Sequence, residues 1–110
     1  MDMAWNKHPA AADIAATVDA DAILATCLAS ATGGNISAYF DLGVIYSTGS
    51  HGIGHDLIEA HKWFNLAAAQ GHEEAAWSRA DISEEMTARE IAEAQRRARA
   101  WLASIDRKAA

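Results

Sequence analysis

The side chains best able to bind a metal ion fall in one short stretch of the sequence: His51, His55, Asp56 and His61. Neutral imidazoles and a carboxylate are suitable ligands for zinc or a similar ion. However, the first two histidines flank a glycine-rich turn at 52–54 that would have to be held in place. Positions 56 and 61 also turn to different faces of a helix. We therefore interpret these four residues as solvated polar side chains, and a metal-binding protein that uses them is the weaker alternative.

No other group of residues has a spacing typical of an enzyme. The sequence lacks the Gly-x-Ser-x-Gly nucleophile turn, the phosphate-binding loop, the dinucleotide-binding glycine pattern and the Cys-x-x-Cys pair. Adjacent acids such as Glu84 and Glu85 lie where a helix is expected to end, which is typical of solvated positions. We expect a protein that is not an enzyme, with no catalytic residue, no cofactor and no metal.

Helices are the elements that could position these side chains. The chain has 110 residues, a single proline and scarcely any run of β-branched residues, which favours one all-α domain. Residues 1–9 are expected to be a disordered lead. Apolar spacing and glycine stops predict five principal helices, at 10–32, 37–47, 57–70, 73–85 and 88–107, the first with a break near Asp19 and Asp21.

The apolar positions within three of these helices define the expected core. They are Ala38, Leu42, Ile45 and Tyr46 in the second helix, Ala60, Trp63, Phe64, Ala67 and Ala68 in the third, and Ile91, Ala94, Ala98, Trp101, Leu102 and Ile105 in the last. Two helix starts carry the pattern of a capping box, Asp56-x-x-Glu59 and Thr87-x-x-Glu90.

A shift of 37 residues superimposes one part of the chain on another. It places Gly34 on Gly71, Ala38 on Ala75 and Phe40 on Trp77, but the match fades further along. Such repetition is typical of stacked helical units with atypical terminal units. We divide the single domain into an N-terminal half unit, a complete repeat, a degenerate half repeat and a capping helix, at 10–35, 36–71, 72–86 and 87–107.

The complete unit resembles a known family. The residues that carry the resemblance are Leu42-Gly43-x-x-Tyr46, the glycine turn at 49–54, Asp56, Ala60-x-x-Trp63-Phe64, Ala67-Ala68 and Gly71. They are similar to the Sel-one-like repeat family, which is related to the tetratricopeptide repeats. The resemblance implies a short right-handed α-solenoid of about five helices with a C-terminal capping helix. It also implies a non-catalytic adaptor or regulator that binds a peptide or protein partner, in bacteria often in signalling.

In related superhelices the first helix of each unit lines the concave surface. The positions left there once the core is removed are Phe40, Val44 and Ser47, with Trp77, Asp81 and Glu84 at the equivalent offsets. An aromatic pair above an acidic rim would suit a peptide with basic flanks. The favoured alternative is that Phe40 and Trp77 pack between successive units.

The distribution of charge limits the kinds of partner. The net charge is -6, but residues 1–88 carry -9 and residues 89–110 carry +3. An acidic body without a dense basic stripe argues against nucleic acid as a partner. No apolar run is long enough for a membrane span, and the single cysteine permits no intrachain disulfide, so we expect a cytoplasmic protein. The acidic body and basic tail leave open a self-assembling structural protein, a homo-oligomer with head-to-tail contacts.

Overall fold

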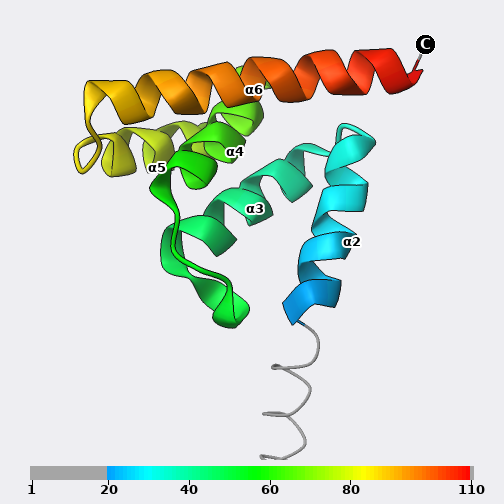
Figure 1. Ribbon diagram of the computed structural model, residues 1–110, viewed down its shortest axis with the longest axis horizontal. Helices are drawn as coiled ribbons and strands as arrows, with labels where there is room; N and C mark the ends of the chain where they lie inside the picture. The colour runs from blue at the N-terminus through cyan, green and yellow to red at the C-terminus, as the bar shows by residue number, and fades with distance from the viewer. Residues whose placement is uncertain (1–19, 110) are drawn as a thin grey trace, which may run out of the picture.

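The computed structural model describes residues 20–109, which form five α-helices and a short 3-10 turn (Figure 1). No strand occurs within this part of the chain, and the prediction of an all-α fold is confirmed. The predicted lead at 1–9, the predicted helix at 10–19 and its break at Asp19 lie outside the described residues. The elements are α2 (Ala20–Thr32), α3 (Ile36–Thr48), η2 (Ser50–Gly52), α4 (Leu57–Ala69), α5 (Glu73–Ser83) and α6 (Ala88–Ala109).

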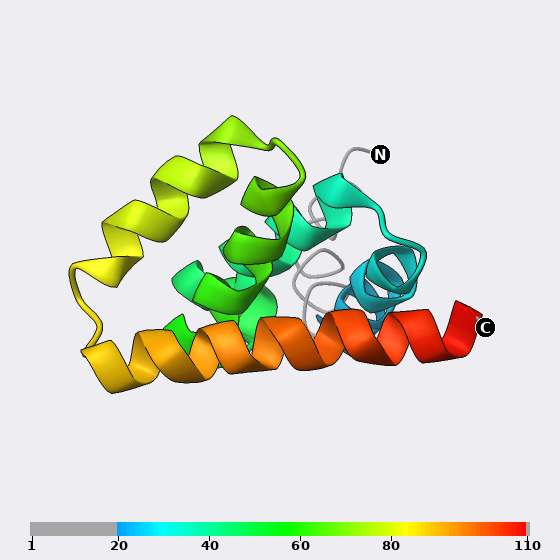
Figure 2. The same ribbon diagram turned by 90° about the horizontal axis from the view of Figure 1, so that it is seen from above.

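Helix α4 is the centre of the packing. It contacts α3, α5 and α6, whereas α2 packs against α3. Figure 2 shows α6 running along the side of the molecule, from the end of α5 toward the side on which α2 lies. Because three neighbours cover α4, it buries side chains on more than one of its faces: Ala60, His61, Trp63, Phe64, Leu66 and Ala67.

Local sequence signals set the turn between α3 and α4. Gly49 ends α3 in the left-handed region, at φ 71°, and donates its N–H to the carbonyl of Ile45. A residue with a side chain is disfavoured in this region, so glycine suits the position. Asp56 then caps α4 by accepting a hydrogen bond from the N–H of Glu59 at 3.1 Å.

The two predicted capping boxes have different outcomes. At α6 the box is complete, since the backbone N–H of Thr87 donates to the Glu90 carboxylate at 2.8 Å and the Glu90 N–H donates to the Thr87 hydroxyl at 3.1 Å. At α4 the reciprocal half was wrong. The Glu59 carboxylate accepts from Lys62 and Arg97 instead, because these cations lie within its reach.

The core consists largely of the predicted residues, but Ile91 and Ile105 are only partly buried, and two other differences are larger. Tyr46 is only partly buried, and the fully buried tyrosine is Tyr39 of the same helix. Leu102 was placed on the apolar stripe of the last helix, but its side chain is 44% exposed. The reason is that α6 packs on α4 through Ala98 and Trp101, and Leu102 lies to one side of that contact.

The last helix is fixed to the repeat by aromatic and ionic contacts. The Trp101 ring meets the Trp63 ring edge-on, with centroids 4.8 Å apart, and its indole N–H lies 3.4 Å from the Tyr39 hydroxyl. The Arg97 guanidinium donates to the Glu59 carboxylate at 2.8 Å. These contacts join α6 to α3 and α4, and they complete the burial of Trp63.

This position of α6 departs from the 37-residue repetition. Trp77 and Trp101 lie 37 residues after Phe40 and Phe64, whose rings pack together with centroids 5.7 Å apart. In a regular second unit Trp101 would therefore cover Trp77. It covers Trp63 instead, and the Trp77 side chain is left 73% exposed.

Candidate functional site

The structure does not bring together the four residues of the metal alternative. His51 and His55 are exposed in the loop between α3 and α4, Asp56 caps α4, and His61 is buried. Within residues 20–109 no three histidine, cysteine or acidic side chains lie close enough to hold a metal ion. The geometry therefore gives the metal alternative no support.

The interpretation of His61 as a solvated side chain was wrong. Its side chain is 3% exposed, and its Nδ1 atom has no hydrogen-bond partner. Burial, with a smaller effect from the charge of Arg79, lowers the pKa of His61 below its usual value. The imidazole is thus held neutral in the core because α4 is covered on several sides, which helical spacing alone did not reveal.

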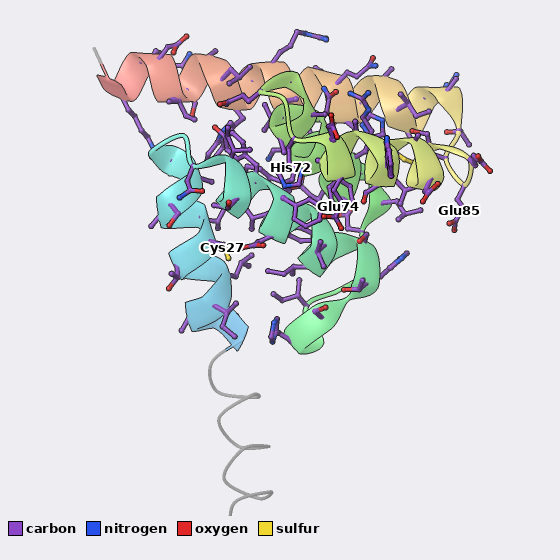
Figure 3. The ribbon with its side chains drawn as sticks, turned by 180° about the vertical axis from the view of Figure 1, so that it is seen from behind. Cys27, His72, Glu74 and Glu85 are labelled. Carbon is purple, nitrogen blue, oxygen red and sulfur yellow. The ribbon has the colours of Figure 1, made fainter. Side chains whose placement is uncertain are left out.

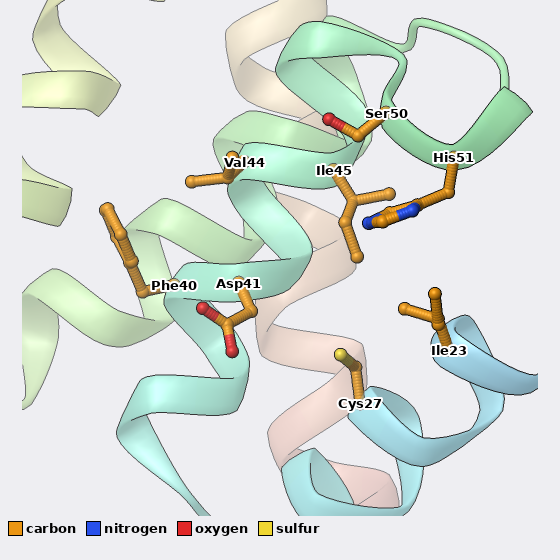
Figure 4. Close-up of a pocket in the computed structure, with 8 residues that line it drawn as sticks. All are labelled: Ile23, Cys27, Phe40, Asp41, Val44, Ile45, Ser50 and His51. Carbon is orange, nitrogen blue, oxygen red and sulfur yellow. The ribbon is translucent and has the colours of Figure 1, made fainter. Parts of the chain in front are cut away.

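A hollow lies where α2, α3 and the turn η2 meet, and we call it the α2–α3 hollow (Figure 4). Its volume is about 350 Å³. The side chains of Cys27 and His51 reach into it from α2 and η2. His51 adopts a left-handed backbone at φ 58°, which is uncommon for a residue with a side chain. The lining residues are Ile23, Cys27, Phe40, Asp41, Val44, Ile45, Ser50 and His51.

The thiol in this hollow is not activated. Burial, followed by the negative charge of Asp41, raises the pKa of Cys27 above its usual value. Because the thiolate is the nucleophilic form, a raised pKa makes the sulfur less reactive at neutral pH. The lining of the α2–α3 hollow is mostly apolar, with polar side chains at its edge. The raised pKa of Cys27 gives no support to a nucleophilic role for its thiol.

The predicted partner-binding residues of α3 are half-buried. Phe40 packs against Phe64 and stacks on the His72 ring, with centroids 4.5 Å apart in the latter pair. Phe40 and Val44 also line the α2–α3 hollow. Ser47 donates its hydroxyl to the Val44 carbonyl at 3.2 Å. The alternative that the aromatic side chain packs between units describes Phe40 well.

The same alternative was wrong for Trp77, whose side chain is the most exposed large apolar group of residues 20–109. Asp81 lies one turn further along α5, and Glu84 directly follows the end of the helix; both are also exposed. Glu73 and Glu74 lie one turn before it. We call this surface the α5 face, and its residues are Glu73, Glu74, Trp77, Ala80, Asp81 and Glu84.

The α5 face is acidic throughout. Arg79, the one basic residue between Glu73 and Ser83, donates to the Asn65 side chain of α4 at 2.6 Å and is thus directed toward α4. Figure 3 shows Glu74 near the start of α5 and Glu85 just past its end. An exposed indole ring surrounded by carboxylates can bind a lysine or arginine side chain through its face and through ion pairs.

His72 is a connecting residue that the sequence did not reveal. Its Nδ1 accepts a hydrogen bond from the N–H of Ala75 at 3.0 Å and so caps α5, while its ring stacks on Phe40. It thereby joins α3 to the first turn of α5. Histidine is not among the usual capping residues, and only its position before a run of acidic helix formers could have indicated this role.

Comparison with known proteins identifies the family of one segment of the chain. Residues 36–72 match the family profile of the Sel1 repeat, which confirms the resemblance inferred from the sequence. This segment runs from the start of α3 to the residue before α5 and leaves the remaining two-thirds of the chain unmatched. No curated protein and no solved structure matched the chain. None of the helices within residues 20–109 has the length and apolar character needed to cross a membrane.

Proposed function

We propose that this chain, in which residues 36–72 form a Sel1 repeat, is a non-catalytic interaction module that binds a basic segment of a protein partner. Sel1 repeats generally mediate protein–protein interaction and are typically non-catalytic. The proposal assigns the binding to the α5 face. A role as an adaptor or regulator in bacterial signalling, and a cytoplasmic location, belong to the same proposal.

The exposure of Trp77 is the observation that carries the proposal. A tryptophan left 73% exposed keeps a large apolar ring in water, where it contributes little to the stability of the fold. Tryptophan is also the residue type most often found at the centre of protein interfaces. Here four exposed carboxylates share its side of the helix, so the surface favours a partner that offers both apolar and cationic groups.

The residues of α3 extend the proposed surface. Helices α3 and α5 contact each other, and the stack of Phe40 on His72 lies between them. A segment bound to Trp77 could continue across His72 toward Phe40, Val44 and Ser47. An extended or helical peptide with basic flanks would fit this path.

A pair of matched peptides tests the proposal. We expect a lysine–leucine helical peptide to bind the full chain in calorimetric titration, and a glutamate–leucine peptide of equal length to bind far more weakly. Trp77→Ala and the double variant Asp81→Lys/Glu84→Lys should each weaken binding of the lysine peptide by about tenfold or more. Asp21→Lys/Asp106→Lys, an equal change of charge at exposed positions of α2 and α6, serves as the control. Equal affinity for both peptides, or no binding of either, would reject the proposal.

A further inference from the structure

Two large apolar side chains are exposed within residues 20–109, and they lie in segments of opposite net charge. Trp77 is 73% exposed on α5, and Leu102 is 44% exposed on α6. Helix α5 together with the turn after it, 73–85, holds five acidic residues and one basic residue. Residues 99–108 of α6 hold three basic residues and one acidic residue. Each exposed apolar group thus lies in a surface whose charge complements that of the other.

The exposed residues near Leu102 form the basic end of α6. Arg99 precedes Leu102 by one helical turn, and the acidic Asp106 follows it by one turn. Arg107 and Lys108 lie beyond Asp106, on other sides of the exposed C-terminal end of the helix. None of these three cations is in an ion pair within the described part of the chain, in contrast to Arg96 and Arg97, which both pair with Glu93. We call this surface the α6 tip. It has three basic residues and one acidic residue, and its members are Arg99, Leu102, Ala103, Asp106, Arg107 and Lys108.

The packing of α5 leaves room for another helix. Its counterpart α3 has a helix on each side, α2 and α4, and Phe64 of α4 covers Phe40. The main contact of α5 is with α4, and Trp77 has no ring packed on it because Trp101 lies on Trp63. A helix with one bulky apolar residue could therefore take, beside Trp77, the place that α4 takes beside Phe40.

The two surfaces cannot meet within one chain. Helix α5 lies at one end of the molecule and the C-terminal end of α6 at the other (Figures 1 and 2). A symmetric contact between two α5 faces is disfavoured because it would bring like charges together. The contact that satisfies both apolar groups and both charges joins the α5 face of one copy to the α6 tip of a second copy.

We infer that this chain self-associates head to tail, with Leu102 of one copy packed on Trp77 of the next. The inference rests on the proposed function, since it names a second copy as the bearer of the basic segment. A contact between two different surfaces leaves one of each free at the ends, so it produces rings or growing chains instead of a closed pair.

Sedimentation velocity of the full chain over a range of concentrations tests the inference. We expect the mass to rise from that of the 11.7 kDa chain through its multiples, and the association to weaken as salt screens the charges. Trp77→Ala and Leu102→Ala should each weaken association by about tenfold or more. Gln95→Ala, an exposed change elsewhere on α6, should leave it unchanged. A constant mass of one chain at all concentrations would overturn the inference, as would association that neither substitution weakens.

A charge exchange identifies the two surfaces more directly. The variant Glu74→Lys/Asp81→Lys/Glu84→Lys reverses the charge of the α5 face, and the variant Arg99→Glu/Arg107→Glu reverses that of the α6 tip. Each should stay monomeric alone, because its two surfaces then carry like charges, and a mixture of the two should associate. All the changes are at exposed positions, and circular dichroism verifies that each variant is folded. A mixture no heavier than its components would contradict the assignment.

The peptide titration separates failure of the inference from failure of the proposed function. If the wild-type chain stays monomeric but binds the lysine–leucine peptide through Trp77, the second copy is the wrong partner and the proposed function stands. If the chain associates through Trp77 but no cationic peptide binds, the self-contact stands and the wider binding function fails.

Discussion

Gly43 of α3 lies directly against the ring of Phe64 in α4. A Cβ atom at position 43 would overlap the Cγ, Cδ1 and Cε1 atoms of that ring. Phe64 is itself 2% exposed and also packs against Phe40 of α3, so the ring has little room to move. The absence of a side chain at residue 43 therefore sets how closely the two helices of the Sel1 repeat approach each other.

Gly43→Ala should destabilise the protein by about 2 kcal/mol, because the added methyl overpacks the contact with Phe64. Helix propensity predicts the opposite sign, since alanine is favoured over glycine within a helix by about 1 kcal/mol. Urea unfolding of the two proteins measures the difference. An increase in stability would show that the Phe64 ring can shift at small cost.

A second substitution identifies the ring as the cause. Phe64→Leu removes part of the ring and should by itself lower the free energy of unfolding. If the overlap is responsible, Gly43→Ala should cost less in the Phe64→Leu protein than in the wild type. A double-mutant cycle measures this coupling, and additive effects would argue against it.

The attachment of α6 should depend on its apolar contact more than on its ion pair. Trp101→Ala should lower the free energy of unfolding by about 3 kcal/mol, because it removes a ring packed on Trp63. Arg97→Met removes the ion pairs of Arg97 with Glu59 and Glu93. Because these three side chains are between 20% and 36% exposed, the loss should cost less than about 1 kcal/mol. Denaturant unfolding compares the two, and an equal or larger effect at Arg97 would contradict this order.

The buried His61 should make stability depend on pH. Its pKa in the folded protein lies below the ordinary value of 6.5, so below pH 6.5 the unfolded chain binds a proton that the folded one does not. The free energy of unfolding should therefore fall as the pH drops through 6.5, until the lower folded pKa is reached.

His61→Leu removes this dependence and replaces an imidazole whose Nδ1 has no partner with an apolar group. We expect its stability to equal or exceed that of the wild type at pH 7, and its advantage to grow between pH 6.5 and 5. Thermal unfolding of both proteins over this pH range measures the difference in their stability.

Glu93 affects stability in a different pH range from His61. Hydrogen bonds from Arg96 and Arg97 lower the pKa of Glu93 from 4.5 to about 2. The stabilisation from Glu93 is thus lost only below about pH 4.5.

Trp77 should be distinguishable from Trp63 by fluorescence and by stability. Trp77→Phe should remove emission that acrylamide quenches readily, and should change the free energy of unfolding by less than about 0.5 kcal/mol. Trp63→Phe should remove poorly quenched emission and destabilise the core. The spectra should be recorded at low micromolar protein concentration, so that self-association does not cover Trp77. A strongly destabilised Trp77→Phe protein would mean that the ring supports the fold.

Helix ends were predictable from the sequence because short-range chemistry determines them. The predicted helix at 57–70 is observed at Leu57–Ala69, between the cap at Asp56 and the glycine at 71. The box at Thr87 was predicted for the same reason, since both of its partners lie within four residues. The family could also be identified, because its pattern is confined to a single unit of the chain.

Features that depend on distant neighbours were harder to predict. Helical spacing could not distinguish Tyr39 from Tyr46 as the buried tyrosine, because both lie beside the core and packing against Trp63 and Trp101 selects the first. The burial of His61 and the exposure of Leu102 follow from where α6 crosses α4. For the candidate site, the sequence indicated six candidate positions for partner binding, but not which of them would be exposed.

The contact between Trp63 and Trp101 also has a consequence for synthesis of the chain on the ribosome. Trp63 lies in the centre of the repeat, yet its cover is supplied by a residue 38 positions later. A nascent chain that ends before α6 would hold the repeat with an aromatic surface still open to water. The repeat can therefore bury Trp63 only after α6 has been synthesised. Until α6 has emerged from the ribosome, the nascent chain exposes an apolar surface that chaperones can bind and proteases can attack.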